Sequence, residues 1–302
     1  MQLDIVLLGI LLLAADAVMA QTLPYRLATF NIRYAATSRE QNEKPWSTRG
    51  PLVVNQLKDA IAGAPDGAET IIGLQEVLHQ QLIDIKTGLG DSWAHIGVGR
   101  DDGKQSGEYN PILYRPSALR LLSNVTKWLS LTPDEPSKSW NAGSRRLVNI
   151  GIFEHIRSGK RFIAANTHLD NASSEARTKG IKVALQVIKD VQKTWGPLAV
   201  SLTGDFNSEP GADAYTTVIN DGYFAEVYTT ANASQRFGEY DTYTSFDPSR
   251  IGQDGTRIDF VWLGPKADQR WEINRYEVLS NVKDSVYLSD HRAVIADVRI
   301  VV

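Results

Sequence analysis

The 302-residue chain contains no cysteine, and this absence narrows the chemistry open to it. Without thiols it has no disulfide framework, no thiolate zinc site and no cysteine nucleophile, so any catalysis relies on oxygen and imidazole groups. Only five histidines supply the imidazoles. Clusters of lysine and arginine are also missing, and the formal charge is −3. This composition disfavours tight binding of a nucleic-acid duplex, although it is compatible with cleaving one.

Long apolar runs are scarce as well. The exception is Ile5–Leu13, which is followed by the small-residue exit Val18-Met19-Ala20. The run is shorter than the roughly 20 residues that cross a bilayer, so we expect a secretory signal peptide over residues 1–20 and a single domain over 21–302. A buried N-terminal helix or strand is the alternative, because no lysine or arginine precedes the run. Three glycosylation sequons, at Asn124, Asn171 and Asn232, fit a secreted glycoprotein.

Strand-like and helix-like segments alternate along the rest of the chain. Short apolar runs predict strands at residues 26–30, 70–75, 110–114, 147–154, 161–167, 198–203, 257–263 and 293–301. Helical spacing of apolar residues predicts helices over about 51–62 and 174–195. Both helices have one apolar face suited to covering a sheet. The pattern predicts a layered α/β (α+β) fold.

Polar residues with catalytic potential stand at the ends of these strands. They are Asn31, Glu76, His168 with Asp170, Asp205 with Asn207, Asp259, and Asp290 with His291. Strand ends at one edge of a sheet are neighbours in space, so these groups can converge on a crevice. Carboxylates crowded together repel one another unless a cation lies among them. Because only oxygen and imidazole donors are available, Mg²⁺, Mn²⁺ or Ca²⁺ would fit.

Each of these residues also has an ordinary structural explanation when taken alone. A single acid at a strand end is commonly a turn former or a helix cap. His79, His95 and His155 lack any comparable context, and we interpret them as surface or core residues. The combination in this order is what indicates a site.

The ordered motifs Thr29-Phe30-Asn31, Gln75-Glu76-Val77, Asn166-Thr167-His168, Gly204-Asp205-Phe206-Asn207, Ile258-Asp259 and Ser289-Asp290-His291 resemble those of the endonuclease/exonuclease/phosphatase superfamily. This superfamily includes deoxyribonucleases, abasic-site endonucleases, neutral sphingomyelinases and inositol polyphosphate phosphatases. The resemblance spans residues 27–294. It implies a four-layered α/β/β/α sandwich, in which two packed mixed sheets are flanked by helices. It also implies divalent-metal-dependent cleavage of phosphate esters.

The resemblance further implies a metal site on one side of the crevice. By motif, Glu76 corresponds to the main metal ligand, and Asn31 and Asp290 complete the metal side. The expected ion is Mg²⁺ or Mn²⁺, with Ca²⁺ as another candidate.

The remaining motif residues correspond to catalytic groups. Asp205 would accept the proton of the attacking water or hold a second metal, and Asn207 would fix a phosphate oxygen. His291, oriented by Asp259, would stabilise charge developing on phosphorus. His168 would contact phosphate or assist the leaving oxygen. Phosphate-ester hydrolysis needs such an arrangement of metal, base and cationic donors.

A polar and aromatic insert over residues 107–146 separates the second and third motifs and bears on the substrate. It resembles the insert of secreted bacterial and fungal members of the superfamily. The candidate substrate contacts are Arg146 and Tyr109, with Glu108 beside it, and Asp170 next to the third motif. Trp128 and Trp140 either stack on a base or sugar or pack beneath the loop.

The sequence thus predicts a secreted, monomeric, metal-dependent hydrolase of phosphate esters, without a stable protein partner. Phosphodiesters, in nucleic acid or a small molecule, are favoured slightly over other substrates. Alternatives are a phosphomonoesterase of inositol or sugar phosphates and a sphingomyelinase-like lipid phosphodiesterase. A non-catalytic binding protein on the same scaffold is the alternative outside enzymes. Metal-independent glycoside hydrolysis would leave the conspicuous amides and histidines without a task.

Overall fold

The computed structural model describes residues 22–250 and 256–301, so the expected signal peptide lies outside the described residues. Within these residues the chain forms two large mixed sheets. The order of the first sheet is β10 (Arg236–Gly238), β12 (Trp271–Val278), β15 (Val294–Ile300), β1 (Leu23–Asn31), β2 (Glu69–Gln75), β4 (Ile112–Tyr114) and β3 (Ala94–Ile96). That of the second is β5 (Leu119–Trp128), β6 (Leu147–His155), β7 (Arg161–His168), β8 (Ala199–Asp205), β11 (Asp259–Gly264) and β9 (Ala225–Glu226). A small hairpin joins β13 (Val282–Lys283) to β14 (Val286–Tyr287).

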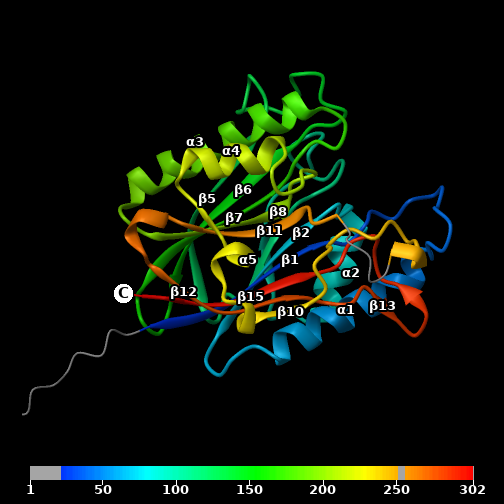
Figure 1. Cartoon of the computed structure of the whole chain (residues 1–302), viewed down its shortest axis with the longest axis horizontal. Coiled ribbons are helices and arrows are strands. Elements are labelled where there is room, and N and C mark those ends of the chain that lie inside the picture. Colours follow the sequence, from blue (N-terminus) through cyan, green and yellow to red (C-terminus); the bar gives the residue numbers. More distant parts are fainter. Residues whose placement is uncertain (1–21, 251–255, 302) are drawn as a thin grey trace, which may run out of the picture.

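Helices cover the outer faces of both sheets (Figure 1). The helices are α1 (Trp46–Ala62), α2 (His79–Leu89), α3 (Ser174–Trp195), α4 (Asp213–Asp221) and the short α5 (Val227–Thr230). Single 3₁₀ turns occur at Ala233–Gln235, Pro248–Arg250 and Lys266–Asp268. No helix in the described part of the chain is both long and apolar enough to cross a membrane.

Three apolar cores hold the layers together. The first fills the space between the sheets and includes Leu27, Phe153 and Phe162. The second lies between β6, β7, β8 and β11 and the helices α3 and α4, and the third lies between the first sheet and the helices α1 and α2. In α3 the buried residues recur at intervals of three and four, and burying each large aliphatic side chain contributes about 1.5–3 kcal/mol. The expected four-layered α/β/β/α sandwich is confirmed.

The first helix differs from the sequence prediction. It begins at Trp46 rather than Pro51, so Pro51 lies in the second turn, where it removes one intrahelical hydrogen bond. The extra turn contains Arg49, whose side chain is wholly buried by contacts with distant parts of the chain. Tertiary contacts therefore override the local preference for a helix that starts at proline.

The interface between the sheets becomes polar toward one end. There Gln75 donates to the Asn166 side-chain oxygen at 2.8 Å, and Asn166 donates to the Leu74 carbonyl at 2.8 Å. These hydrogen bonds between buried groups link β2 to β7, although the Gln75 side-chain oxygen has no hydrogen-bond partner among the described residues. The polar end of the interface marks the edge of the sandwich at which the candidate residues gather.

Candidate active site

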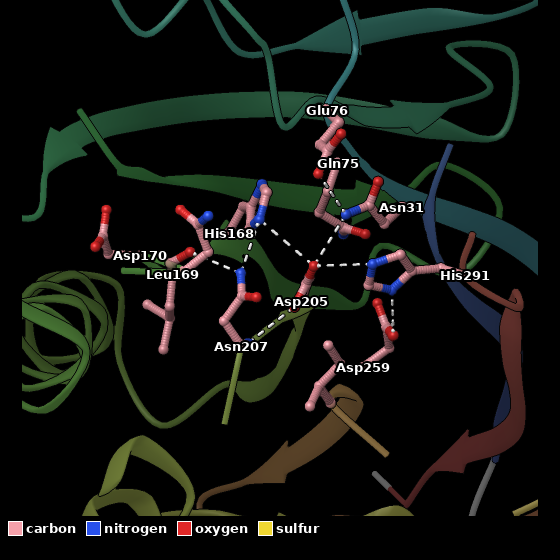
Figure 2. Close-up of polar contacts among 12 residues, drawn as sticks. Asn31, Gln75, Glu76, His168, Leu169, Asp170, Asp205, Asn207, Asp259 and His291 are labelled. Atoms are coloured by element: carbon pink, nitrogen blue, oxygen red, sulfur yellow. Dashed lines mark hydrogen bonds and ion pairs between the residues drawn. The ribbon is translucent and has the colours of Figure 1, made fainter. Parts of the chain in front are cut away.

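Strand register brings the predicted residues to a common edge. Asn31 of β1 lies opposite Gln75, the residue before Glu76, in a parallel pair. His168 at the end of β7 lies opposite Asp205 at the end of β8, and Asp205 in turn lies opposite Asp259 at the start of β11. The sequence analysis expected these strand ends to be neighbours at one edge of a sheet. The structure places these side chains together from both sheets (Figure 2).

Asp205 occupies the centre of the site. One carboxylate oxygen lies 2.9 Å from the Asn31 amide nitrogen, 3.4 Å from His168 Nε2 and 3.6 Å from His291 Nε2 (Figure 2). The other oxygen accepts a hydrogen bond from the Asn207 backbone N–H at 2.8 Å. Burial and the nearby Asp259 carboxylate raise the pKa of Asp205 to about 7, against the opposing influence of His291. A carboxylate with such a pKa can accept a proton near neutral pH.

His291 is held in its charged form by its surroundings. Its Nδ1–H donates to the fully buried Asp259 carboxylate at 2.8 Å. Burial alone would lower the pKa of His291, but the neighbouring carboxylates of Asp259, Asp205 and Asp290 raise it well above its ordinary value. The Asp259 contact also fixes the ring orientation, so the charged Nε2–H is directed to Asp205 and the cleft.

His168 is held in the opposite charge state. Its Nδ1 lies 2.8 Å from Arg146 Nη1, and its Nε2 lies 3.1 Å from the Asn207 amide nitrogen. Because arginine can only donate, Nδ1 must be the unprotonated acceptor, and Nε2 carries the single ring proton near the Asp205 carboxylate at 3.4 Å. Burial, together with the charges of Arg146, Arg100 and His291, lowers the pKa of His168 well below its ordinary value. The site therefore pairs a cationic histidine with a neutral one across Asp205.

Glu76 and Asp290 form an acidic group beside this centre. Glu76 accepts hydrogen bonds from the Asn31 amide at 3.1 Å and the Tyr34 backbone N–H at 3.1 Å. Its backbone adopts a positive φ of 58°, which a non-glycine residue keeps only where its surroundings impose it. Burial and the Glu76 charge raise the pKa of Asp290 to about 6. The two acids are close enough to repel each other.

The donors present fit a hard divalent cation. Ligand atoms of Asp205, Asp259 and His291 lie within 4.8 Å of one another and could hold a metal ion. His291 and Asp259, however, already form a charged hydrogen bond, which occupies the imidazole. The oxygens of Glu76 and Asp290 suit Mg²⁺ or Mn²⁺ better, and a cation there would relieve the repulsion between the two acids. The predicted ligand Asn31 directs its amide nitrogen at Glu76 and Asp205, while its side-chain oxygen accepts the Arg33 backbone N–H at 3.0 Å, so it orients the acids in this structure.

The cleft above these groups has a volume of about 750 Å³. The residues that line it include Glu76, Arg146, His168, Asp205, Asn207, Asp290 and His291 of the predicted set. Glu108 and Asn171, which the sequence analysis also named, line it as well, but Arg33, Arg100, Glu209 and Tyr243 were not predicted. These belong to irregular segments with no periodic signal. Two of them contact motif residues: the Tyr243 ring lies 5.0 Å from that of His291 between centroids, and the Arg33 backbone N–H donates to the Asn31 side chain at 3.0 Å.

Two predicted substrate contacts lie away from the lining of the cleft. The Asp170 carboxylate accepts hydrogen bonds from the backbone N–H groups of Gly143, Ser144, Ala172 and Ser173. It therefore joins the insert to the start of α3. The Tyr109 hydroxyl donates to the Lys104 carbonyl at 2.9 Å and lies 3.0 Å from His79 Nδ1, with only 3% of the residue exposed. The structure gives both side chains contacts that support loops behind the cleft.

Glu108, Ser144 and Arg146 of the insert, together with Arg100 just before it, line one side of the cleft. Arg100 donates to the Glu108 carboxylate at 2.6 Å, and Arg146 Nη1 lies 3.9 Å from the same carboxylate. Arg146 also donates to the Asn171 side chain at 3.1 Å, so this sequon residue faces the cleft wall. Trp128 is buried, with its indole N–H donating to the Arg100 carbonyl at 2.8 Å, and thus packs beneath the loop.

Comparisons with known proteins agree with this geometry. The profile of the endonuclease/exonuclease/phosphatase family matches residues 28–291, and the chain belongs to this family. A family member from Bacteroides vulgatus is 34% identical (TM-score 0.78; 92% of this chain and 99% of that chain). Another, from Bacteroides thetaiotaomicron, is 28% identical (TM-score 0.81; 93% and 99%). A mannosyl-6-phosphatase from B. thetaiotaomicron is also 28% identical (TM-score 0.79; 91% and 99%).

No curated protein matches the chain. Members of the family hydrolyse phosphate esters and use divalent metals. The chain is therefore a phosphoester hydrolase, and the group of buried acids is a candidate metal centre.

The raised pKa values of the buried acids predict how divalent ions affect stability. Folded Asp205 and Asp290 hold protons up to about pH 7 and 6, whereas the unfolded chain releases them near pH 4. Without metal, their contribution to the free energy of unfolding therefore falls as pH rises from about 4 to 7. A bound cation replaces these protons. We expect the increase in melting temperature caused by Mg²⁺ to grow over the same range.

Differential scanning fluorimetry between pH 5 and 8, with Mg²⁺ or with KCl of equal ionic strength, measures this effect. His168, whose lowered pKa makes folding less favourable in acid, acts equally in both series and cancels in the difference. A Mg²⁺ effect that does not change with pH would contradict the prediction.

Proposed function

We propose that this protein is a secreted, monomeric, divalent-metal-dependent hydrolase of small phosphate esters. The observation that carries the proposal is the arrangement of cationic His291 and neutral His168 around Asp205, beside the oxygen donors of Glu76 and Asp290. A phosphate ester needs a water aimed at phosphorus, a base for its proton and positive charge for the oxygens. This group of side chains can supply the base and the fixed positive charge.

In this proposal each residue of the site has a specific role. Asp205 accepts the proton of the water whose oxygen bonds to phosphorus as the ester P–O bond breaks, and the leaving alkoxide takes up a proton from solvent to become the alcohol. The charged Nε2–H of His291 hydrogen-bonds an oxygen of the phosphoryl group, and the Asn207 amide contacts another. Glu76 and Asp290 would hold the cation, with Asn31 orienting Glu76 through its amide, and the cation would neutralise phosphate charge. Because one Asp205 oxygen lies within 3.6 Å of both histidines, the protonation of each of these groups affects the others.

The charge of the cleft favours a small substrate over a long polyanion. Each of the lining arginines is already close to a carboxylate: Arg33 lies 3.5 Å from Glu40, Arg100 2.6 Å from Glu108, and Arg146 3.8 Å from Asp170. No surplus of positive charge is left there to follow a nucleic-acid backbone. This changes the sequence-based preference for phosphodiesters. The 28% identical mannosyl-6-phosphatase supports a sugar phosphate as the first candidate, and a small phosphodiester is the second.

A substrate panel tests the proposal. The panel contains mannose 6-phosphate, inositol phosphates, bis(p-nitrophenyl) phosphate, sphingomyelin vesicles, RNA, and single- and double-stranded DNA. Each substrate is incubated with Mg²⁺, with EDTA, and with the His291→Asn variant in Mg²⁺. We expect EDTA-sensitive, His291-dependent release of phosphate from a sugar phosphate. Activity that survives EDTA would overturn the metal dependence, and preferential cleavage of a nucleic acid would overturn the choice of a small substrate.

A further inference from the structure

Arg49 is a buried side chain outside the cleft that no motif identifies. It lies in the first turn of α1, has 0% of its surface exposed and is absent from the cleft lining. Its guanidinium donates to the backbone carbonyls of Lys44 (2.9 Å), Ile32 (2.9 Å), Leu288 (2.6 Å), Arg33 (3.2 Å) and Tyr34 (3.4 Å). Every nitrogen of the guanidinium is therefore used on main-chain oxygen.

These carbonyls belong to two segments that carry the metal-side residues. Residues 32–34 directly follow Asn31 at the end of β1, and Leu288 is two residues before Asp290. A single nitrogen, Arg49 Nη1, bridges the two segments. The Ser289 hydroxyl also donates to the Asn31 carbonyl at 2.7 Å. The distance between Asn31 and Asp290 is thus set largely by groups beneath the site.

Packing alone does not account for an arginine at this position. A buried cation is costly unless it is paired and fully hydrogen-bonded. The Glu43 carboxylate is 3.8 Å away, beyond hydrogen-bond distance, and burial lowers the pKa of Arg49 despite it. The planar guanidinium can reach carbonyls in several directions at once, which a lysine ammonium on its flexible stem cannot do in the same way. This property suits a side chain that fixes one segment relative to another.

We propose that Arg49 is a positioning residue that fixes the segment of Asn31, whose amide hydrogen-bonds Glu76, relative to the segment of Asp290, and so sets the spacing of the two acids that would hold the divalent cation. The inference rests on the proposed metal dependence. It predicts that Arg49 contributes to metal affinity without touching the metal or the substrate.

The test compares Arg49→Lys with Arg26→Lys. Arg26 is a matched control because it is also buried, lies near the opposite end of β1, and is fully engaged by Asp297 (2.7 Å) and the Ala60 carbonyl (2.6 Å). Both variants should lower the melting temperature. Calorimetric titration with Mn²⁺ should give an affinity about 10–100-fold weaker for Arg49→Lys, as is typical when a group supporting a metal ligand is lost. Arg26→Lys should keep the wild-type affinity.

Hydrogen–deuterium exchange supplies a readout that needs no metal. In metal-free protein, backbone amides of residues 32–34 and 288–290 should exchange faster in Arg49→Lys than in wild type, and Arg26→Lys should leave them unchanged. Wild-type exchange in both segments together with wild-type Mn²⁺ affinity would overturn the positioning role. If wild-type protein binds no Mn²⁺, the proposed function fails, and the exchange data alone still decide whether Arg49 fixes the segments.

Ser289→Ala is the second variant, for use if Arg49→Lys does not fold. It removes the hydrogen bond to the Asn31 carbonyl and leaves the guanidinium in place. The same hydroxyl also contacts the Asp290 carboxylate and the His291 backbone N–H, so exchange at residues 32–34 is the readout specific to the link between the segments. We expect a smaller loss of Mn²⁺ affinity and faster exchange at residues 32–34. Wild-type behaviour in both measurements would overturn the inference that the spacing of these segments governs metal binding.

Discussion

Replacing His291 with asparagine should lower kcat by about 10³-fold or more while the protein stays folded. The substitution removes the charged Nε2–H that faces Asp205 and the cleft. A fixed donor aimed at developing negative charge is worth about 10²–10³ in kcat, and loss of the positive charge adds to this. Asparagine is preferred to alanine because its amide can still donate to Asp259, which would otherwise be a buried carboxylate without its partner.

The control for this prediction is His155→Asn. His155 lies at the end of β6, contacts Ser158 at 2.8 Å and is absent from the cleft lining. Steady-state rates on the best substrate of the panel, with circular dichroism melting curves, give the comparison. If His291→Asn kept more than a tenth of wild-type kcat at saturating Mg²⁺, the assignment of His291 would be wrong.

The candidate site was accessible to sequence reasoning because its residues directly adjoin buried strands. Asn31, Glu76, His168 and Asp205 each close an apolar run, and parallel pairing places such ends side by side. The alternation of strands with amphipathic helices likewise predicts the layers. Local pattern and tertiary arrangement agree here, as expected of elements whose burial depends on their own sequence.

Other elements gave no such signal. β5 forms the edge of the second sheet and is mostly half-buried, so its apolar residues do not alternate clearly. β12 carries several charged residues and was not predicted. The wall formed by Arg100 and Glu108 lies in irregular chain, where no period exists to be read. The positions of Arg100 and Glu108 follow from the packing of the loops around the insert against the two sheets.

Arg49 is the clearest example of a residue whose position beneath the site the sequence does not indicate. In the sequence it is a charged residue near a helix start, a position that usually faces solvent. Its burial depends on the Leu288 carbonyl, which is 239 positions away in the chain. Arg49 acts on backbone carbonyls, which every residue has. Its partners are therefore not marked by any particular side chain, and no motif reveals its role.

Replacing Glu76 with glutamine should separate metal binding from folding. The variant keeps the shape of the side chain but removes the negative charge that we propose binds the cation. We expect Mn²⁺ affinity to fall by at least about 10-fold and kcat at fixed Mg²⁺ by about 10³-fold. Without metal, the variant should be at least as stable as wild type at pH 7. The reason is that the neighbouring Asp290, whose pKa is raised by burial and by Glu76, no longer faces a second negative charge.

Glu69→Gln is the matched control for this prediction. Glu69 begins the same strand, β2, is paired with Arg115 at 2.7 Å and lies outside the cleft lining. It should keep wild-type Mn²⁺ affinity and kcat. Calorimetry, kinetics and melting curves with and without Mg²⁺ distinguish the outcomes. A Glu76→Gln protein that is unstable without metal would mean that Glu76 serves the fold, through its bonds to Asn31 and the Tyr34 backbone, rather than a cation. A stable variant that no longer gains stability from Mg²⁺ would place the cation at Glu76, because only a ligand for the folded state raises stability in this way.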